Sequence, residues 1–162
     1  MRLLSSDGAT VSLQPTGYQL DRPGGTAGPG TDCDDDDWLM IHGEARTADG
    51  RAWEFTGPCL TALEAAALGA WLRAAAGQDA GLVTGQILFT EPNLAFLPGT
   101  GDGRHTRIQV RFSCESLPGW LTRDAPGWQA AGYLLPLHVS RSGLAEAAQA
   151  WGHECSKFPH RL

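Results

Sequence analysis

An acidic run at residues 32–37, interrupted only by Cys33, has the residue types and spacing that come closest to a known site chemistry. Its first, third and fifth positions are aspartates, like the first three ligands of a calcium loop, because hard cations favour several carboxylate oxygens from a tightly turning backbone. The pattern then fails, since Asp37 stands where that loop needs glycine and Gly43 where it needs a bidentate glutamate. We therefore predict no metal site. Two interpretations of the run remain, a solvated acidic rim or a surface that contacts a partner.

Cysteines and histidines, the other common ligands and nucleophiles, are dispersed along the chain. The cysteines lie at positions 33, 59, 114 and 155, and the histidines at 42, 105, 138, 153 and 160. Neither set has the short spacings of a zinc site, and no serine stands in a Gly-x-Ser-x-Gly elbow. We predict that Cys114 and Cys155 are core residues and that His42 and His138 are half-buried, hydrogen-bonded side chains in strands. These positions predict no catalytic residue and no cofactor.

Four glutamates leave an alternative open. Glu44, Glu54, Glu91 and Glu115 could pair as general acid and base, but the sequence does not give their separations in space. Glu91 and Glu115 lie near the ends of predicted strands, and a small enzyme or ligand-binding domain built around them is our second hypothesis. A glycine-rich stretch at residues 99–103 lacks the Lys-Ser/Thr pair of a phosphate loop and leads into a strand, so it predicts a simple connection.

Composition and charge narrow the class of protein. With 162 residues and an apolar fraction of 42%, the chain is long enough to form one core, and we predict a single domain over residues 1–162. The net charge of −6 argues against a nucleic-acid binder, which needs a basic surface, and favours a basic protein partner. No apolar run approaches the roughly 18 residues that span a membrane. The dispersed cysteines and the lack of a secretory leader indicate reduced thiols and a cytoplasmic location.

Turn signals between alternating segments predict a chain built from hairpins. The turn at residues 7–8 joins 1–5 to 9–14, the turn at 48–50 joins 38–46 to 51–55, and the turn at 91–93 joins 86–90 to 94–97. Alternation predicts two more strands, at 106–114 and 133–139, and Pro136 places the second at a sheet edge. A Pro/Gly-rich stretch leads into the acidic run and predicts a flexible loop over residues 21–37.

Two helices are expected. Thr61 and Glu64 form a capping box that satisfies free backbone amides, and apolar residues at three- and four-residue spacing predict a helix over residues 62–76 that Gly77 ends. The same spacing over residues 144–155 predicts a closing amphipathic helix. The predicted fold class is α+β, with a mainly antiparallel, hairpin-built β-sheet and two amphipathic helices packed on it.

Four segments, in this order, resemble the WapI family of small bacterial immunity proteins. They are WLMIHG at residues 38–43, WEFTGPCLT at 53–61, FTEPNLAF at 89–96 and FSCESLP at 112–118. The likeness extends over nearly the whole chain, including the first predicted helix and the closing Phe-Pro pair. The chain departs from the family pattern in the Pro/Gly insertion at residues 21–31 and in the length of its acidic run.

This resemblance implies a cytoplasmic protein that binds the toxic C-terminal domain of a contact-delivered toxin, typically a nuclease, and blocks it without catalysis. It assigns no contact residue, because immunity families diverge at their toxin-facing surfaces. The residues themselves predict partner contacts, since an acidic patch competes for the basic groups that a nuclease presents to phosphate. The predicted contacts are Asp34, Asp35, Asp36, Asp37 and Trp38.

Trp38 has two interpretations, because a tryptophan beside an acidic surface is either an exposed anchor for a partner or a core residue. A third hypothesis for the whole chain is an oligomerisation module that pairs through an exposed strand edge.

Overall fold

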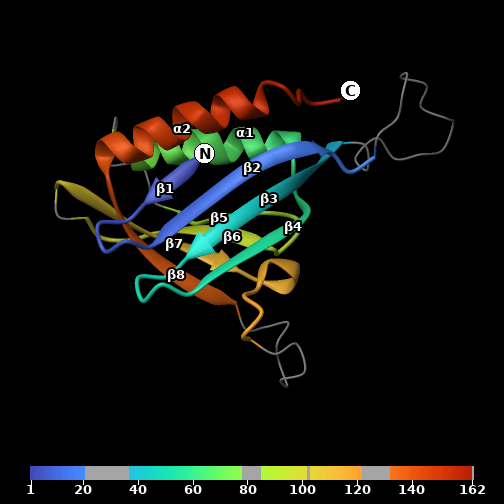
Figure 1. The fold of residues 1–162 in the computed structure, drawn as a ribbon. Coiled ribbons are helices and arrows are strands. Elements are labelled where there is room, and N and C mark those ends of the chain that lie inside the picture. Colours follow the sequence, from blue (N-terminus) through green and yellow to red (C-terminus); the bar gives the residue numbers. More distant parts are fainter. Residues whose placement is uncertain (21–36, 78–84, 102, 122–131, 162) are drawn as a thin grey trace, which may run out of the picture.

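Two four-stranded antiparallel sheets and two helices make up the part of the chain that the computed structural model describes, which is residues 1–20, 37–77, 85–101, 103–121 and 132–161. The first sheet contains, in order, β1 (Arg2–Leu4), β2 (Thr10–Tyr18), β3 (Trp38–Arg46) and β4 (Ala52–Thr61). The second contains β5 (Ile87–Leu88), β6 (Leu94–Pro98), β7 (His105–Phe112) and β8 (Tyr133–Ser140). Helix α1 (Ala62–Ala75) follows β4, and α2 (Arg141–Cys155) follows β8 (Figure 1).

The α+β class, the three predicted hairpins and both helices are confirmed, whereas the expected single sheet is in fact two. Turn signals identify which consecutive strands pair, but they do not say whether successive hairpins share a sheet. Here α1 separates β4 from β5, and the described strands after it form a second sheet in the order β5-β6-β7-β8. Pro136 lies in β8, which is an edge strand as predicted.

The predicted strand at residues 106–114 ends early, at Phe112. Cys114 has a φ of 53° and opens the short 3₁₀ helix η2 (Cys114–Ser116), where it is half-buried. The expectation of a core cysteine at position 114 is therefore wrong. Cys155, at the end of α2, is also half-buried, and it packs against the core.

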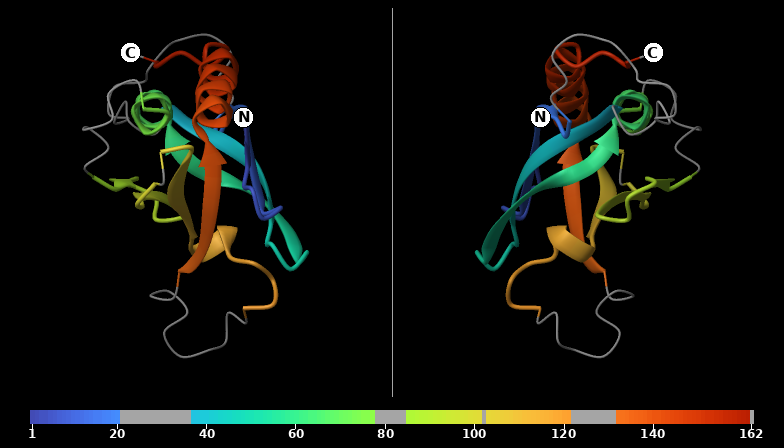
Figure 2. Two further views of the ribbon diagram at one scale, coloured as in Figure 1. Left: turned by 90° about the vertical axis from the view of Figure 1, so that its left-hand side faces the viewer. Right: turned by 90° about the vertical axis from the view of Figure 1, so that its right-hand side faces the viewer.

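Both sheets and both helices contribute to one core. Val11 and Ile41 of the first sheet, Val110 and Leu137 of the second, and Trp151 of α2 are all fully buried members of it. Figure 2 shows the two sheets side by side, with the helix pair lying along one end of both. The helices therefore leave the outer face of the first sheet uncovered.

The helix ends follow the sequence signals. Glu64 N–H donates to the Thr61 hydroxyl at 3.2 Å, and the Thr61 N–H donates to the Glu64 carboxylate at 2.9 Å, which completes the predicted capping box. After the last turn Gly77 adopts a φ of 82°, a left-handed conformation that glycine accepts without strain. The two helices are joined by the buried Trp151 indole, which donates a 2.7 Å hydrogen bond to the backbone oxygen of Ala65.

The β1–β2 turn reaches the free edge of β8. Ser6 N–H donates to the backbone oxygen of His138 at 2.9 Å, and His138 N–H donates to the Ser5 hydroxyl at 2.8 Å. These bonds use backbone groups that an incoming strand would need. At this point the edge of β8 is closed to another strand, while the hypothesis of an oligomerisation module stays untested.

Candidate functional site

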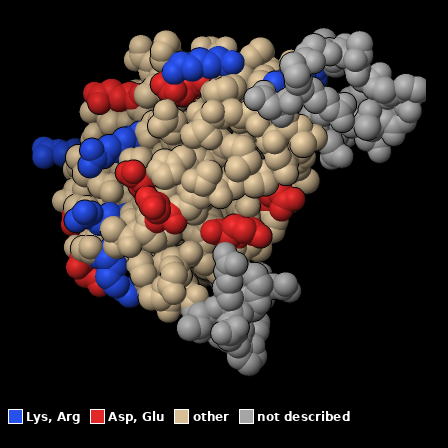
Figure 3. Space-filling model, turned by 45° about the vertical axis from the view of Figure 1, so that its right-hand side comes forward, with Lys and Arg blue, Asp and Glu red and all other residues tan. Residues whose placement is uncertain are grey.

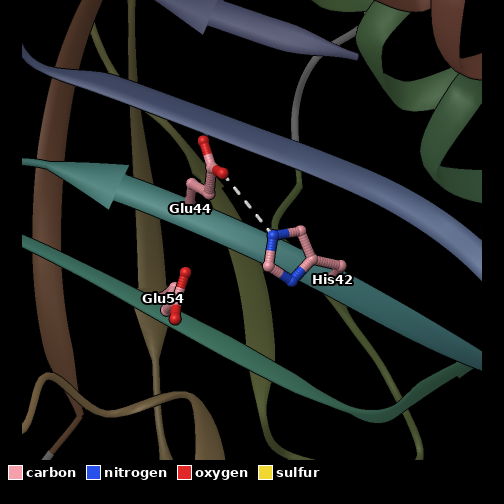
Figure 4. A group of neighbouring side chains, drawn as sticks. All are labelled: His42, Glu44 and Glu54. Carbon is pink, nitrogen blue, oxygen red and sulfur yellow. Dashed lines mark ion pairs between the residues drawn. The ribbon is translucent and has the colours of Figure 1, made fainter.

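The outer face of the first sheet carries a group of side chains with evident binding chemistry. Side chains alternate along β3 and β4, so that Ile41 and Phe55 point into the core while His42, Glu44 and Glu54 point outward. Figure 4 shows the three outward side chains near one another on the two neighbouring strands. The sheet thus presents two carboxylates and an imidazole to solvent.

Gly43 holds this part of β3 close to β4. It lies between His42 and Glu44 and directly opposite Phe55, whose ring covers its inner side. A Cβ atom at position 43 would lie 2.1 Å from Cζ of Phe55, so a larger residue does not fit unless the ring moves. Close packing on the inner face therefore fixes the positions of the two outward side chains.

The hairpin register sets the geometry of the group. Glu44 lies directly opposite Glu54, and His42 lies opposite Thr56. Nε2 of His42 is 3.5 Å from Oε1 of Glu44, and Nδ1 of His42 forms a 3.0 Å hydrogen bond with Oγ1 of Thr56. One ligand atom from each of His42, Glu44 and Glu54 lies within 4.8 Å of the others. The three donors therefore share one small volume above the sheet.

The opposed glutamates repel each other, because like charges directly opposite on a sheet face are destabilising. Among the residues that the structure describes, Glu54 has no ion pair or hydrogen bond, and Glu44 is paired with His42. The Glu44 side chain exposes 65% of its surface and His42 35%, so water screens part of the repulsion. Such an arrangement can accept a positive charge, either a metal ion or a basic side chain.

Two hollows meet at this group. One has a volume of about 460 Å³ and is lined by Arg2, Thr10, Ser12, Glu44, Ala45, Arg46, Ala52, Trp53 and Glu54. The other has a volume of about 290 Å³ and is lined by Met1, Ser12, Leu13, Gln14, His42, Glu44, Ala150 and Glu154. Ser12 and Glu44 border both, so the face is recessed on either side of Glu44. Figure 3 shows acidic side chains spread over this side of the molecule and Lys and Arg mainly along one margin.

The structure gives Asp37 a different role from the one predicted for it. Positions 34–36 of the predicted contact set lie outside the described residues. Asp37 is described and exposes only 4% of its side chain. Its Oδ2 lies 2.7 Å from Nδ1 of His160, and its Oδ1 accepts a 3.0 Å hydrogen bond from the backbone N–H of Arg161. Both carboxylate oxygens of Asp37 are therefore used inside the molecule, which leaves little of the side chain for a partner, and the contact predicted for it stays a prediction.

Trp38 begins β3, pairs with Thr61 across the sheet and is half-buried. It is therefore neither a fully exposed anchor nor a fully buried core residue. Enough of its surface is accessible for it to stay among the proposed contacts.

The C-terminal residues 159–161 fasten this end of the sheet, and we call them the tail clasp. The Arg161 guanidinium donates a 3.1 Å hydrogen bond to the backbone oxygen of Leu20 and lies 3.3 Å from the centre of the Tyr18 ring. The Tyr18 hydroxyl in turn donates to the backbone oxygen of Pro159. Since its N–H also binds Asp37, Arg161 connects both residues that flank positions 21–36.

The described cysteines are poor nucleophiles. Burial raises the pKa of Cys59 to about 12 and that of Cys155 to about 11. Desolvation, followed by the nearby charges of Glu115 and Glu91, also raises the pKa of Cys114. Thiolates are therefore scarce at neutral pH. Glu91 and Glu115 are themselves exposed and line neither of the two hollows.

Sequence reasoning named Glu44 and Glu54 among four candidate carboxylates but did not pair them. A signal was available, because the two residues stand at equal separations from Asp49 in the predicted turn, and a regular hairpin register places such residues opposite each other. The prediction for His42 is confirmed, since it is half-buried and hydrogen-bonded to Thr56. Its place beside Glu44 follows from the two-residue period of a strand.

The chain belongs to the WapI-like immunity protein family, whose family model matches residues 2–159. This match covers nearly the whole chain and supports an immunity role with a protein partner. No curated protein and no solved structure matches the chain. Within the described residues, neither helix is both long and apolar enough to cross a membrane.

Proposed function

We propose that this protein protects its own cell by binding a cognate toxin domain and covering the surface that the toxin needs for its activity. The family match over residues 2–159 is the observation that carries this proposal. A protein of 162 residues can neutralise a toxin in this way without any catalysis, provided that the complex is tight enough to persist.

The described residues support a binding role more than an enzymatic one. An enzyme needs a nucleophile or an acid–base pair with a suitable pKa, placed in a recess that excludes water. The thiols of Cys59 and Cys155 have pKa values far above neutrality, and the hollow that Glu44 and Glu54 line lies on the solvent-facing side of the sheet. Groups of this kind suit contact with the surface of another protein.

A nuclease is the class of toxin that the charge favours. A nuclease must present basic groups to phosphates, and a net charge of −6 gives this chain a complementary field. Asp34, Asp35 and Asp36 remain proposed contacts that steer the encounter, with Trp38 as an anchor beside them. We place the encounter in the cytoplasm, where the free thiols of the described cysteines stay reduced.

The test begins with a tagged copy of the chain, expressed in the source organism and used to capture its partner at low salt. The captured toxin domain is identified by mass spectrometry, purified and assayed for cleavage of RNA and DNA while the chain is titrated in. We expect complete inhibition at one molar equivalent. A toxin domain that keeps its activity in the presence of excess chain would overturn the proposal, and inhibition by far less than one equivalent would show that the chain is an enzyme.

The steering role of the acidic run is tested with the triple variant Asp34→Asn/Asp35→Asn/Asp36→Asn. We expect association with the captured toxin domain to slow by about tenfold at low salt and to lose much of its salt dependence. A variant that neutralises exposed Asp49, Glu115 and Glu146 is the matched control, because it removes the same charge elsewhere. Equal association rates for the two variants would remove residues 34–36 from the interface.

A further inference from the structure

We propose that the outer face of the first sheet is the toxin-binding surface and that Glu44 and Glu54 together receive one basic side chain, an arginine or a lysine, from the toxin. This inference rests on the function proposed above and deepens it by naming the surface and the chemistry of recognition. The surface comprises the outward side chains of β1 to β4 that line the hollow of about 460 Å³ and its neighbour of about 290 Å³.

The first support is that Glu44 and Glu54 are exposed among the described residues and that the face around them is recessed. The opposite face of the sheet packs into the core, and both helices lie along one end (Figure 2). The two hollows meet at Ser12 and Glu44, so a protruding side chain of a partner can enter on either side of this point. Small residues, Ser12 on one side of Glu44 and Ala52 beside Glu54, leave room for a long side chain.

The second support is the unfavourable charge arrangement of the free protein. Glu44 and Glu54 are directly opposite each other, and neither has a Lys or Arg partner among the described residues. A guanidinium or ammonium group between them would replace this repulsion with charge-assisted hydrogen bonds. The energy gained on binding then includes relief of the repulsion, which a pair that is already neutralised could not supply.

The third support is the position of two arginines on the same face. Arg2 shares a cross-strand row with Ser12, Glu44 and Glu54, and Arg46 lies one row away. Neither arginine forms an ion pair with a described carboxylate, so both charges stay available. The hollow therefore presents both negative and positive charge, with Arg46 next to Glu44 along β3 and Arg2 two strands away from Glu44. This pattern fixes the orientation of a partner that carries a basic side chain and an acidic one.

A metal ion is the competing occupant, because His42, Glu44 and Glu54 offer three ligand atoms within 4.8 Å of one another. Two features favour the side chain. Arg2 and Arg46 line the same hollow and repel a doubly charged ion more strongly than a singly charged group. The hollow also extends from Glu44 and Glu54 to Arg2 and Thr10 on the neighbouring strands, as contact with a protein surface requires.

The test compares two variants that remove the same charge. Glu44→Gln/Glu54→Gln alters the proposed contact, and Glu115→Gln/Glu146→Gln alters exposed glutamates elsewhere. Affinity for the captured toxin domain is measured by calorimetry at low and high salt, and thermal unfolding of each free variant is measured alongside. We expect the first variant to bind at least tenfold more weakly and to melt at a higher temperature than the wild type, and the second to change neither property.

Opposite effects on affinity and stability are the signature of this proposal, because a merely structural role would lower both. If the wild type binds the toxin domain and Glu44→Gln/Glu54→Gln binds equally well, the inference is overturned while the proposed function stands. If the wild type itself does not bind, the proposed function fails first. Titration with Zn²⁺ and Mn²⁺ distinguishes a basic side chain from a metal ion as the occupant. Toxin binding that EDTA abolishes and either metal restores would overturn the side-chain inference.

Discussion

Carboxylates in two regions of this protein differ in whether their oxygens are already bound within the molecule. Asp37 closes the densest acidic run of the sequence, yet it is buried and both of its oxygens are used by the tail clasp. Glu44 and Glu54 are isolated from each other in sequence, yet they meet on an exposed face with no Lys or Arg partner among the described residues. The difference teaches that the partners of a carboxylate, and not the local density of charge in the sequence, decide whether it is free to bind another molecule.

The largest expected loss of stability comes from a substitution in β3, the strand that positions Glu44 opposite Glu54. In Gly43→Ala the new methyl group would overlap the Phe55 ring, so we expect a loss of about 3 kcal/mol in the free energy of unfolding. Gly57→Ala is the matched control, because a Cβ at this strand position meets no atom within 4 Å. Urea denaturation of both variants measures the difference. Similar losses in the two would show that the Phe55 ring moves aside readily.

Removal of the buried carboxylate tests the comparison directly. Asp37→Ala leaves the Arg161 N–H and the His160 ring without their partner, and we expect a loss of about 2 kcal/mol. The same change in charge at an exposed position, Glu54→Ala, should stay within about 0.5 kcal/mol of the wild type. Chemical denaturation at pH 7 measures both. The comparison would not survive if Glu54→Ala proved as destabilising as Asp37→Ala.

A smaller change in stability is expected when the exposed Glu44–Glu54 pair is neutralised. Because like charges oppose each other there, Glu44→Gln/Glu54→Gln should gain about 0.5 kcal/mol in the free energy of unfolding at low salt. The gain should shrink in 1 M salt, where repulsion between exposed charges is screened. A gain that salt does not change would point to a cause other than charge.

The last effect is absent at neutral pH and confined to alkaline pH, and it concerns a buried acid with no cationic partner. Burial raises the pKa of Cys59 from 9.0 to about 12, so above pH 9 the unfolded chain loses this proton while the folded protein keeps it. Stability should therefore fall between pH 9 and 12 and be unaffected by this group below pH 9. Cys59→Ala, followed by denaturation across this range, should show a shallower fall than the wild type. An unchanged slope would mean that the thiol does not carry the effect.

The sequence could predict much of the local structure because local rules decide it. The turn at residues 48–50 joins the strands as expected, and the capping box of Thr61 starts α1 where predicted. The division into two sheets was not predictable, since no turn signal reports whether β4 and β5 are neighbours. The early end of β7 was not predictable either. Cys114 continues the apolar alternation of the sequence, although its backbone has already left the strand.

The same reasoning explains the outcome at the candidate site. The internal role of Asp37 depends on His160, which is 123 positions away in the chain, and no pattern near the acidic run indicates that contact. The Glu44–Glu54 pair is a property of one hairpin and follows from distances to its turn. Local partners can thus be derived from sequence by counting residues, whereas a carboxylate with a distant partner looks like a free one.

The tail clasp has a consequence for how freely this protein can vary. Since Arg161 holds both Leu20 and Asp37, the two ends of positions 21–36 are kept together by contacts outside that stretch. The entropy of closing a loop grows only with the logarithm of its length, about 0.6 kcal/mol for each doubling. Residues can therefore be gained, lost or exchanged between the two anchors at little cost to either sheet, so this stretch of an immunity protein can change in sequence and length without refolding the rest of the protein.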